Sequence, residues 1–283
     1  MIVPGIIIRP LEETEEYHSA EHVQKQAWNM QEVEIVPSHL LITGNKNGGL
    51  VLGAFDGGQL VGMLFGFLGQ GEDGRYKHCS HMMGVIPSHR GKGIGTALKI
   101  CQREFALKQG LDLVTWTYDP LEHVNATLNI ARLGATSRTY LRNLYGEMRD
   151  ALNQGLASDR LQVDWWIRSP RVIDSMNRSR RRSSLASLQE AGGAVIKTRT
   201  GERGLLEPDD WMTEDAPTIL LEIPAGFQRI KSSDMALARA WRQLTREIFE
   251  HYFEEEYQIT EFLSEKEVGK RRCFYVLEKS KDV

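Results

Sequence analysis

The sequence predicts an α/β or α+β protein, because its first half carries strong signals of alternating strands and helices. Residues 50–55 and 60–68 are β-prone runs joined by an Asp-Gly-Gly turn, which tolerates positive φ and favours a hairpin. Residues 78–85 form a further strand-like run, followed by a helical stretch over residues 95–109 and a strand over residues 111–118. A strand, a crossover helix and a second strand place the two strands parallel.

The crossover helix is indicated by one apolar stripe. Its members recur at spacings of three and four residues and are Ile94, Ala97, Leu98, Cys101 and Phe105. Gly110 supplies the stop signal. The other elements are expected, in order, as a strand over residues 6–9, a helix over 13–28, a short helix over 125–133, strands over 161–167, 194–198 and 218–223, a long helix over 233–253, and a terminal hairpin of residues 258–263 with 272–277.

The composition excludes several classes of protein. The 35 Lys and Arg residues nearly balance the 38 Asp and Glu residues, so no bulk nucleic-acid binding is expected. No apolar run approaches the roughly 20 residues of a membrane span, and the N-terminal run reads as a first strand. The three cysteines show no C-x-x-C spacing, so neither a disulfide framework nor a zinc knuckle is expected. A reducing, cytoplasmic setting fits this sequence.

A change of composition divides the chain. Between residues 168 and 187 the sequence becomes rich in Arg and Ser, so we place a boundary there and predict domains over residues 1–168 and 169–283. The run of Arg178, Arg180, Arg181 and Arg182 is interpreted as a solvated linker, with contact to nucleic acid or an anionic partner as the alternative. Three roles are open for the second part: it extends the sheet, caps the acceptor pocket or builds a homodimer. The dimer would use the apolar face of the long helix, formed by Leu237, Trp241, Leu244, Ile248 and Tyr252.

The most informative segment is a glycine-rich turn between a strand and a helix. Gly91, Gly93 and Gly95 let the backbone approach a ligand closely, and the free N–H groups of the first helical turn suit a phosphate group. Arg90 and Lys92 would add positive charge. The residues therefore predict a cofactor that carries phosphate.

Spacing narrows the choice of cofactor. A dinucleotide fingerprint would need glycine at Thr96, and a nucleotide P-loop does not fit either. The run Gly84-Val85-Ile86-Pro87 followed by Arg90-Gly91-Lys92-Gly93-Ile94-Gly95 resembles the acyl-CoA pyrophosphate motif of the GNAT superfamily of N-acyltransferases. The resemblance implies acetyl-CoA or another acyl-CoA as cofactor, bound by Gly84, Val85, Ile86, Arg90, Gly91, Lys92, Gly93, Ile94, Gly95 and Thr96, with Asn125 and Asn129 reaching the pantetheine arm or the substrate.

The resemblance covers about residues 1–168 and implies a mixed, mostly antiparallel twisted sheet flanked by helices, with a smaller C-terminal α+β part. The strands over residues 78–85 and 111–118 should splay apart around the pantetheine arm, with the backbone of Gly84 and Val85 facing the thioester. Asparagine is also a common helix N-cap, and for Asn125 both interpretations stay open.

His81 is the candidate base. Acylation needs a neutral amine, and an imidazole with a pKa of about 6.5 suits the removal of its proton. Some superfamily members that resemble arylalkylamine acyltransferases carry histidine at this relative position and use it to relay the amine proton. A partly buried structural histidine is the alternative interpretation. His78 should lie on the opposite face of the strand, and a zinc site formed by His78, Cys79 and His81 lacks a visible fourth ligand.

The usual acid of the superfamily is a tyrosine, and its position here falls on Ile130. Tyr140 and Tyr145 are the substitute candidates and Tyr118 is a third, although a tyrosine in such a position is more often a core aromatic. Catalysis by positioning of the thioester alone, with no dedicated acid, is the other alternative.

The sequence thus predicts a cytoplasmic N-acyltransferase that moves an acetyl or other short acyl group from acyl-CoA to the amine of a small molecule by direct attack. Trp28, Trp116 and Tyr118 are candidates for the acceptor pocket, and the tryptophans are otherwise core residues. The whole-chain pattern, including the tail over residues 272–278, resembles longer bacterial GNAT proteins with a C-terminal extension, some of whose relatives are associated with amino-acid N-succinylation. A non-catalytic acyl-CoA sensor and a protein-directed acyltransferase are the further alternatives.

Overall fold

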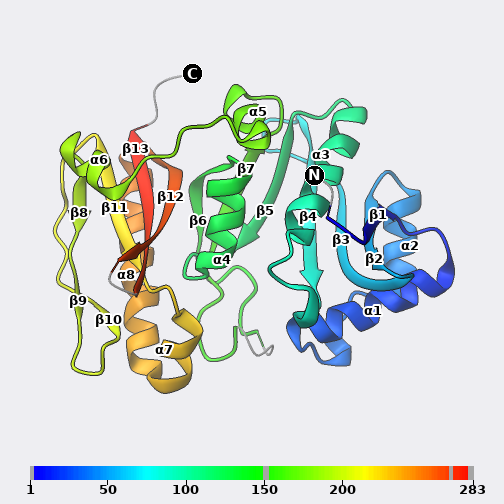
Figure 1. The fold of residues 1–283 in the computed structure, drawn as a ribbon, viewed down its shortest axis with the longest axis horizontal. Helices are drawn as coiled ribbons and strands as arrows, with labels where there is room; N and C mark the ends of the chain where they lie inside the picture. The colour runs from blue at the N-terminus through cyan, green and yellow to red at the C-terminus, as the bar shows by residue number, and fades with distance from the viewer. Residues whose placement is uncertain (1–2, 149–152, 268–269, 280–283) are drawn as a thin grey trace. The chain divides into compact units, whose positions relative to one another are not determined.

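The computed structural model describes residues 3–148, 153–267 and 270–279 (Figure 1). The chain packs into two compact units. The first comprises the described residues of Met1–Trp116 with Trp166–Arg168, and the second comprises Thr117–Met148, Asn153–Trp165 and the described residues from Ser169 onward. The predicted catalytic span, residues 1–168, contains parts of both units, and its assignment as one domain stays a prediction.

The first unit contains a mixed sheet in the order β1-β2-β3-β4-β5. Its strands are β1 (Ile6–Pro10), β2 (Leu50–Asp56), β3 (Gln59–Gln70), β4 (Tyr76–Val85) and β5 (Leu113–Tyr118). The first four strands are antiparallel neighbours, and β5 is parallel to β4, as the crossover predicted. The β2–β3 hairpin turns at Gly57 and Gly58, both with positive φ, which confirms the predicted turn.

The helices of this unit are α1 (Thr14–Trp28), α2 (Ser38–Lys46) and α3 (Ile94–Lys108), with short 3-10 turns η1 (Glu32–Glu34) and η2 (Pro87–His89). Their apolar faces share one core with the sheet, to which α1 contributes Ala20 and Val23, α2 contributes Leu41, and α3 contributes Leu98. The mostly antiparallel sheet flanked by helices is the predicted architecture. In this architecture α3 packs against β4, so the glycine-rich turn that connects them lies at the end of β4.

The second unit contains strands in the order β7-β6-β12-β13-β11-β8, and neighbouring strands are antiparallel except for β8, which is parallel to β11. Its elements are α4 (His123–Ala126), the π-helical η3 (Thr127–Arg132), β6 (Thr136–Leu141), β7 (Arg160–Trp166), α5 (Pro170–Asn177), α6 (Leu185–Glu190), β8 (Ala194–Ile196), β9 (Thr198–Thr200), β10 (Leu206–Pro208), β11 (Thr218–Ile223), α7 (Phe227–Ser233), α8 (Met235–Glu254), β12 (Tyr257–Glu267) and β13 (Lys270–Lys279). The strands β9 and β10 pair separately. Because β12 pairs with β6, residues beyond 169 extend the sheet of this unit.

The apolar face predicted for the long helix is covered inside the second unit. Trp241, Ile248 and Tyr252 of α8 are buried, and Trp241 Nε1 donates to the Leu206 carbonyl oxygen at 2.9 Å. Because this face is already buried within the unit, it is not available to form a homodimer, and that assignment was wrong.

The Arg- and Ser-rich stretch is packed only in part, and Arg178, Arg181 and Arg182 of the run predicted as a solvated linker are exposed. It carries α5 and α6, and Arg180 forms an ion pair of 2.7 Å with Glu261 of β12. Arg182 donates to the Ala131 carbonyl oxygen at 3.4 Å. Among the described residues, no helix has the length and apolar character needed to cross a membrane.

Candidate functional site

The glycine-rich turn is shaped to receive a phosphate group. After β4, the chain makes the turn η2 and enters α3 at Ile94, with Gly93 as N-cap at φ +88° and Gly91 at φ +77°. L side chains avoid this region, and a Cβ added at either glycine would meet nothing within 4 Å, so the turn is open on its outer side. The N–H groups of the first turn of α3 have no intrahelical acceptors, and the helix dipole favours an anion there. These features fit the pyrophosphate of an acyl-CoA.

The predicted phosphate ligands divide into two kinds. Arg90 is tied to the protein, because its guanidinium donates to the Val85 carbonyl oxygen at 3.1 Å and to the Ala27 carbonyl oxygen. It holds the end of β4 to α1. Lys92 is exposed, whereas the side chains of Ile94 and Thr96 are buried, so these two residues can offer a ligand only their backbone.

The strands β4 and β5 pair over only a short ladder, which ends before the last residues of β4. Among the described residues their parallel ladder joins His78 with Val114 and Cys79 with Thr115, and the next pair in this register would be Ser80 with Trp116. The separation beyond the ladder is the opening that the resemblance assigns to the pantetheine arm.

A lysine that sequence reasoning missed spans this opening. Lys99 of α3 donates from Nζ to Ser80 Oγ at 2.9 Å and to Gln102 Oε1 at 3.0 Å, and the same nitrogen lies 3.4 Å from the centroid of the Trp116 ring. It therefore contacts both strands where their ladder ends. The sequence contains one signal that could have identified this lysine. Thr96, Lys99 and Gln102 form a polar row at spacings of three beside the apolar stripe of the helix.

Lys99 is only 2% exposed, and its burial lowers the pKa of the amine well below 10.5. The face of Trp116 works in the opposite direction, since an aromatic face stabilises the charged form. The ring of Trp116 thus packs on a lysine of its own unit.

His81 lies at an irregularity of β4. On β3, Phe65 pairs with Met82 and Gly66 pairs with Ser80, so His81 is the extra residue of a bulge. Its ring centroid lies 5.9 Å from that of Phe65, and its side chain is exposed. Partial desolvation lowers the pKa of His81 below 6.5, so the imidazole is neutral at pH 7 and able to accept a proton.

His78 lies on the opposite side of the strand, as predicted, and is fully buried. Its ring is within contact distance of Phe105, with centroids 5.8 Å apart. The described residues contain no group of three or more His, Cys, Asp or Glu side chains that could hold a metal ion.

Trp28 packs on the backbone that the resemblance assigns to the thioester. A Cβ added to Gly84 would lie 2.6 Å from the Trp28 ring, so only glycine allows this approach. The half-buried indole at the end of α1 and the Gly84-Val85 segment therefore form one surface within the first unit.

Two of the three candidate tyrosines are committed to other contacts. Tyr140 donates to Asp159 Oδ2 at 2.9 Å, and its burial and that carboxylate both raise its pKa above 10. Tyr118 is buried with its hydroxyl 3.2 Å from that of Tyr275, and burial raises its pKa as well. Tyr145 is 52% exposed, and its hydroxyl lies 2.9 Å from Thr117 Oγ1.

The two candidate asparagines differ in exposure. Asn125 is exposed and lies inside α4, whose N-cap is Glu122, so the cap interpretation of Asn125 was wrong. Asn129 is 4% exposed in the π-helical turn η3, and Ile130 beside it is fully buried.

Comparison with known proteins agrees with the site. Residues 10–133 match the family model of the Acetyltransferase (GNAT) family. The chain resembles the ribosomal-protein-S18-alanine N-acetyltransferase from Escherichia coli at 17% identity and a TM-score of 0.45, over 57% of this chain and 94% of the other. It resembles an N-acetyltransferase from Staphylococcus aureus Mu50 at 16% identity and a TM-score of 0.46, over 58% of this chain and 99% of the other.

The yncA protein from Salmonella typhimurium, solved with its cofactor acetyl-CoA, is similar at 16% identity and a TM-score of 0.46, over 58% of this chain and 94% of the other. No curated protein matches the chain. The family match covers β4, the glycine-rich turn, α3 and β5, which are the elements that fit the pyrophosphate and the pantetheine arm. Residues 10–133 therefore match an acetyltransferase domain of the GNAT family, and this match supports an acyl-CoA-dependent N-acyltransferase.

Proposed function

We propose that the chain transfers an acetyl or other short acyl group from acyl-CoA to the amine of a small molecule, and that His81 accepts the amine proton. The observation that carries this proposal is the exposed imidazole of His81 at the bulge of β4, on the strand that ends in Gly84 and Val85. A neutral imidazole beside the expected thioester segment has the protonation state that a base needs at pH 7.

The reaction requires the protein to position the thioester and the amine and to remove a proton from the amine. A bound acyl-CoA supplies an activated thioester carbonyl with a good leaving thiolate. The acceptor nitrogen attacks that carbonyl, the carbon–sulfur bond breaks, and the proton of the nitrogen passes to the imidazole of His81. Trp28 and Gly84 line the protein surface nearest to this step, and Trp28 offers an apolar wall for the acceptor.

The tyrosine contacts favour one of the three candidate acids. Tyr140 donates to the buried Asp159, and Tyr118 contacts the buried hydroxyl of Tyr275. Neither hydroxyl is therefore suited to donate a proton to the thiolate. Tyr145 is the exposed member of the three and is the proposed donor if a dedicated one is used. Protonation of the released thiolate by water requires no side chain at all.

The test compares His81→Ala with His22→Ala, since His22 is an exposed histidine on α1 of the same unit. Thermal shift with CoA, acetyl-CoA and succinyl-CoA measures binding, and transfer is measured to polyamines, arylalkylamines and free amino acids. We expect His81→Ala to lower kcat/KM by about a hundredfold or more with an unchanged thermal shift, because the base acts after binding. His22→Ala should leave both unchanged.

The other outcomes discriminate between the alternatives. Stabilisation by a CoA ester with no transfer to any amine would indicate the non-catalytic sensor. Preference for succinyl-CoA with amino acids would indicate the N-succinyltransferase. A cytoplasmic location belongs to the same proposal and is supported by the three free thiols of Cys79, Cys101 and Cys273.

A further inference from the structure

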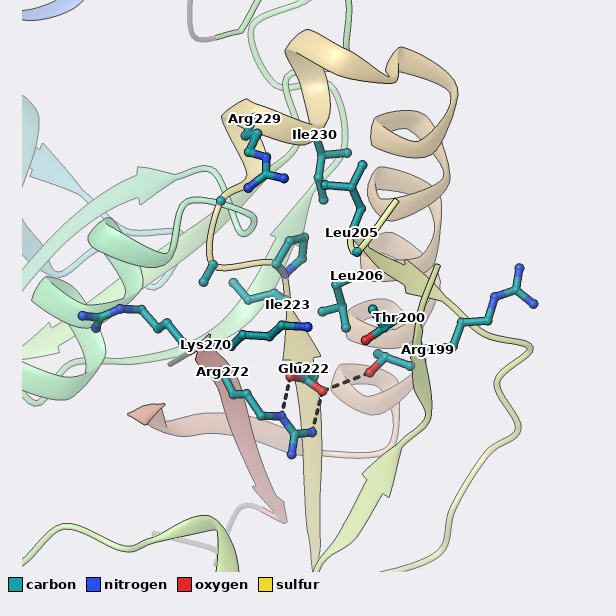
Figure 2. Close-up of a pocket in the computed structure, with 16 residues that line it drawn as sticks. Arg199, Thr200, Leu205, Leu206, Glu222, Ile223, Arg229, Ile230, Lys270 and Arg272 are labelled. Atoms are coloured by element: carbon teal, nitrogen blue, oxygen red, sulfur yellow. Dashed lines mark hydrogen bonds and ion pairs between the residues drawn. The ribbon is translucent and has the colours of Figure 1, made fainter. Parts of the chain in front are cut away.

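A cavity lies within the second unit, and none of the residues that line it is assigned to acyl transfer. Its volume is about 550 Å³, which is in the range of small-molecule sites. It is lined by β9, the turn before β10, the end of β11, the start of α7 and the start of β13 (Figure 2).

One wall of the cavity is apolar. Leu205, Leu206, Ile223 and Ile230 all line it, and the last two are almost fully buried. Removing apolar ligand surface from water against such a wall is favourable in proportion to the area covered. The wall therefore suits a ligand with an apolar ring or short chain.

Part of the charge around the cavity is already neutralised. Glu222, which is 4% exposed, accepts two hydrogen bonds of 2.8 Å from Arg272 and one of 3.0 Å from Thr198 (Figure 2). Arg199 forms an ion pair of 3.2 Å with Glu207, and its side chain extends away from the cavity. In the pairs of Glu222 with Arg272 and of Arg199 with Glu207, the two opposite charges neutralise each other.

Three lining cations, Arg229, Lys270 and Arg271, form no ion pair with a described carboxylate, and Arg271 instead donates to Ser264 Oγ at 2.7 Å. Arg229 of α7 and Lys270 of β13 line the cavity, and both side chains point toward its middle (Figure 2). Within the described part of the chain, neither has a carboxylate within ion-pair distance. Two convergent cations beside an apolar wall attract a negatively charged group and hold it through charge-assisted hydrogen bonds.

We infer that this cavity binds a small organic anion, with a carboxylate or phosphate group held by Arg229 and Lys270 and an apolar body against Leu206 and Ile223. Carboxylates and phosphates present the same acceptor chemistry to a guanidinium and an ammonium group. The inference does not depend on the proposed acceptor or on His81.

To test this, the full chain is titrated with phenyl phosphate, benzoate, inorganic phosphate and the neutral analogue benzamide at constant ionic strength. Binding is measured by calorimetry. Each titration is run with and without saturating acetyl-CoA, so that binding of a phosphate at the glycine-rich turn is recognised separately. The double variant Arg229→Gln/Lys270→Gln removes both cations. Arg239→Gln on α8 is the matched control, because it removes an exposed cation of the same unit that does not line the cavity.

We expect saturable binding of phenyl phosphate or benzoate, no binding of benzamide, and at least about tenfold weaker binding by the double variant, since charge-assisted hydrogen bonds contribute this much or more. The Arg239→Gln variant should bind as the wild type does. Absence of saturable binding by any of the anions at millimolar concentration would overturn the inference, as would equal affinity of the wild type and the double variant. Equal affinity for inorganic phosphate and phenyl phosphate would refute the role of the apolar wall.

Discussion

Replacing His78 by leucine should make the protein more resistant to acid. The His78 side chain is 0% exposed, and within the described residues neither ring nitrogen has a hydrogen-bond partner. Burial, with a smaller contribution from the charge of Lys99, lowers the pKa of His78 to about 4. Leucine is close to histidine in volume and carries neither a titratable group nor an orphaned nitrogen.

The size of the effect follows from the pKa. An unfolded histidine titrates near 6.5, so a native pKa of about 4 corresponds to about 3 kcal/mol of unfolding free energy. The sign is fixed by proton binding. Below pH 6.5 the unfolded chain takes up a proton that native His78 refuses, so stability falls until the pH reaches about 4 and this residue then contributes no further slope.

Thermal melts of the wild type and His78→Leu between pH 4 and pH 8 measure the difference. The gap between them should widen by about 3 kcal/mol from pH 7 to pH 4, which corresponds to roughly 6–12 °C in Tm for a chain of this size. His22→Leu, an exposed histidine on α1, should follow the wild type at every pH. Parallel curves for the wild type and His78→Leu would show that His78 titrates normally in the native state.

Three further substitutions test the site. Lys99→Met keeps the buried stem but removes the donor to two buried acceptors, so it should cost about 1–3 kcal/mol and raise the KM for acyl-CoA, whereas Lys108→Met at the exposed end of α3 should change neither. Gly93→Val forces a branched side chain to φ +88°, and melting with and without CoA should show about 1–3 kcal/mol of lost stability and weaker binding. Tyr140→Phe should cost about 1 kcal/mol by removing one donor of Asp159 and leave kcat unchanged, whereas loss of turnover at full stability would make Tyr140 the acid.

Local signals in the sequence predicted the elements that position the acyl-CoA site. Gly57 and Gly58 determine the hairpin through their own backbone conformation, and the stripe on α3 needs only helical periodicity. The strand β5 and the terminal hairpin of β12 and β13 carry enough β-prone residues to be recognised in the same way. These features depend on residues within a few positions of each other.

Features that depend on distant partners could not be predicted. Arg180 reaches Glu261, 81 residues along the chain, and without that contact its segment reads as solvated linker. Tyr140 and Asp159 are likewise brought together by the pairing of β6 with β7, so the sequence alone left Tyr140 a candidate acid. The division of the chain within β5 has no local composition signal, because it reflects how whole elements pack.

His78 and His81 show how much of the chemistry is decided by backbone geometry. Strand alternation turns His78 toward α3, where Phe105 and the close approach of Gly66 bury the ring. The bulge adds one residue to β4, so the ring of His81 leaves the ladder and lies exposed beside Phe65. The same side chain is therefore a neutral core residue at one position and an accessible proton acceptor three positions later. A substitution that restores the regular ladder at the bulge should displace the proposed base while leaving the glycine-rich turn intact, so the expected result is loss of turnover without loss of cofactor binding.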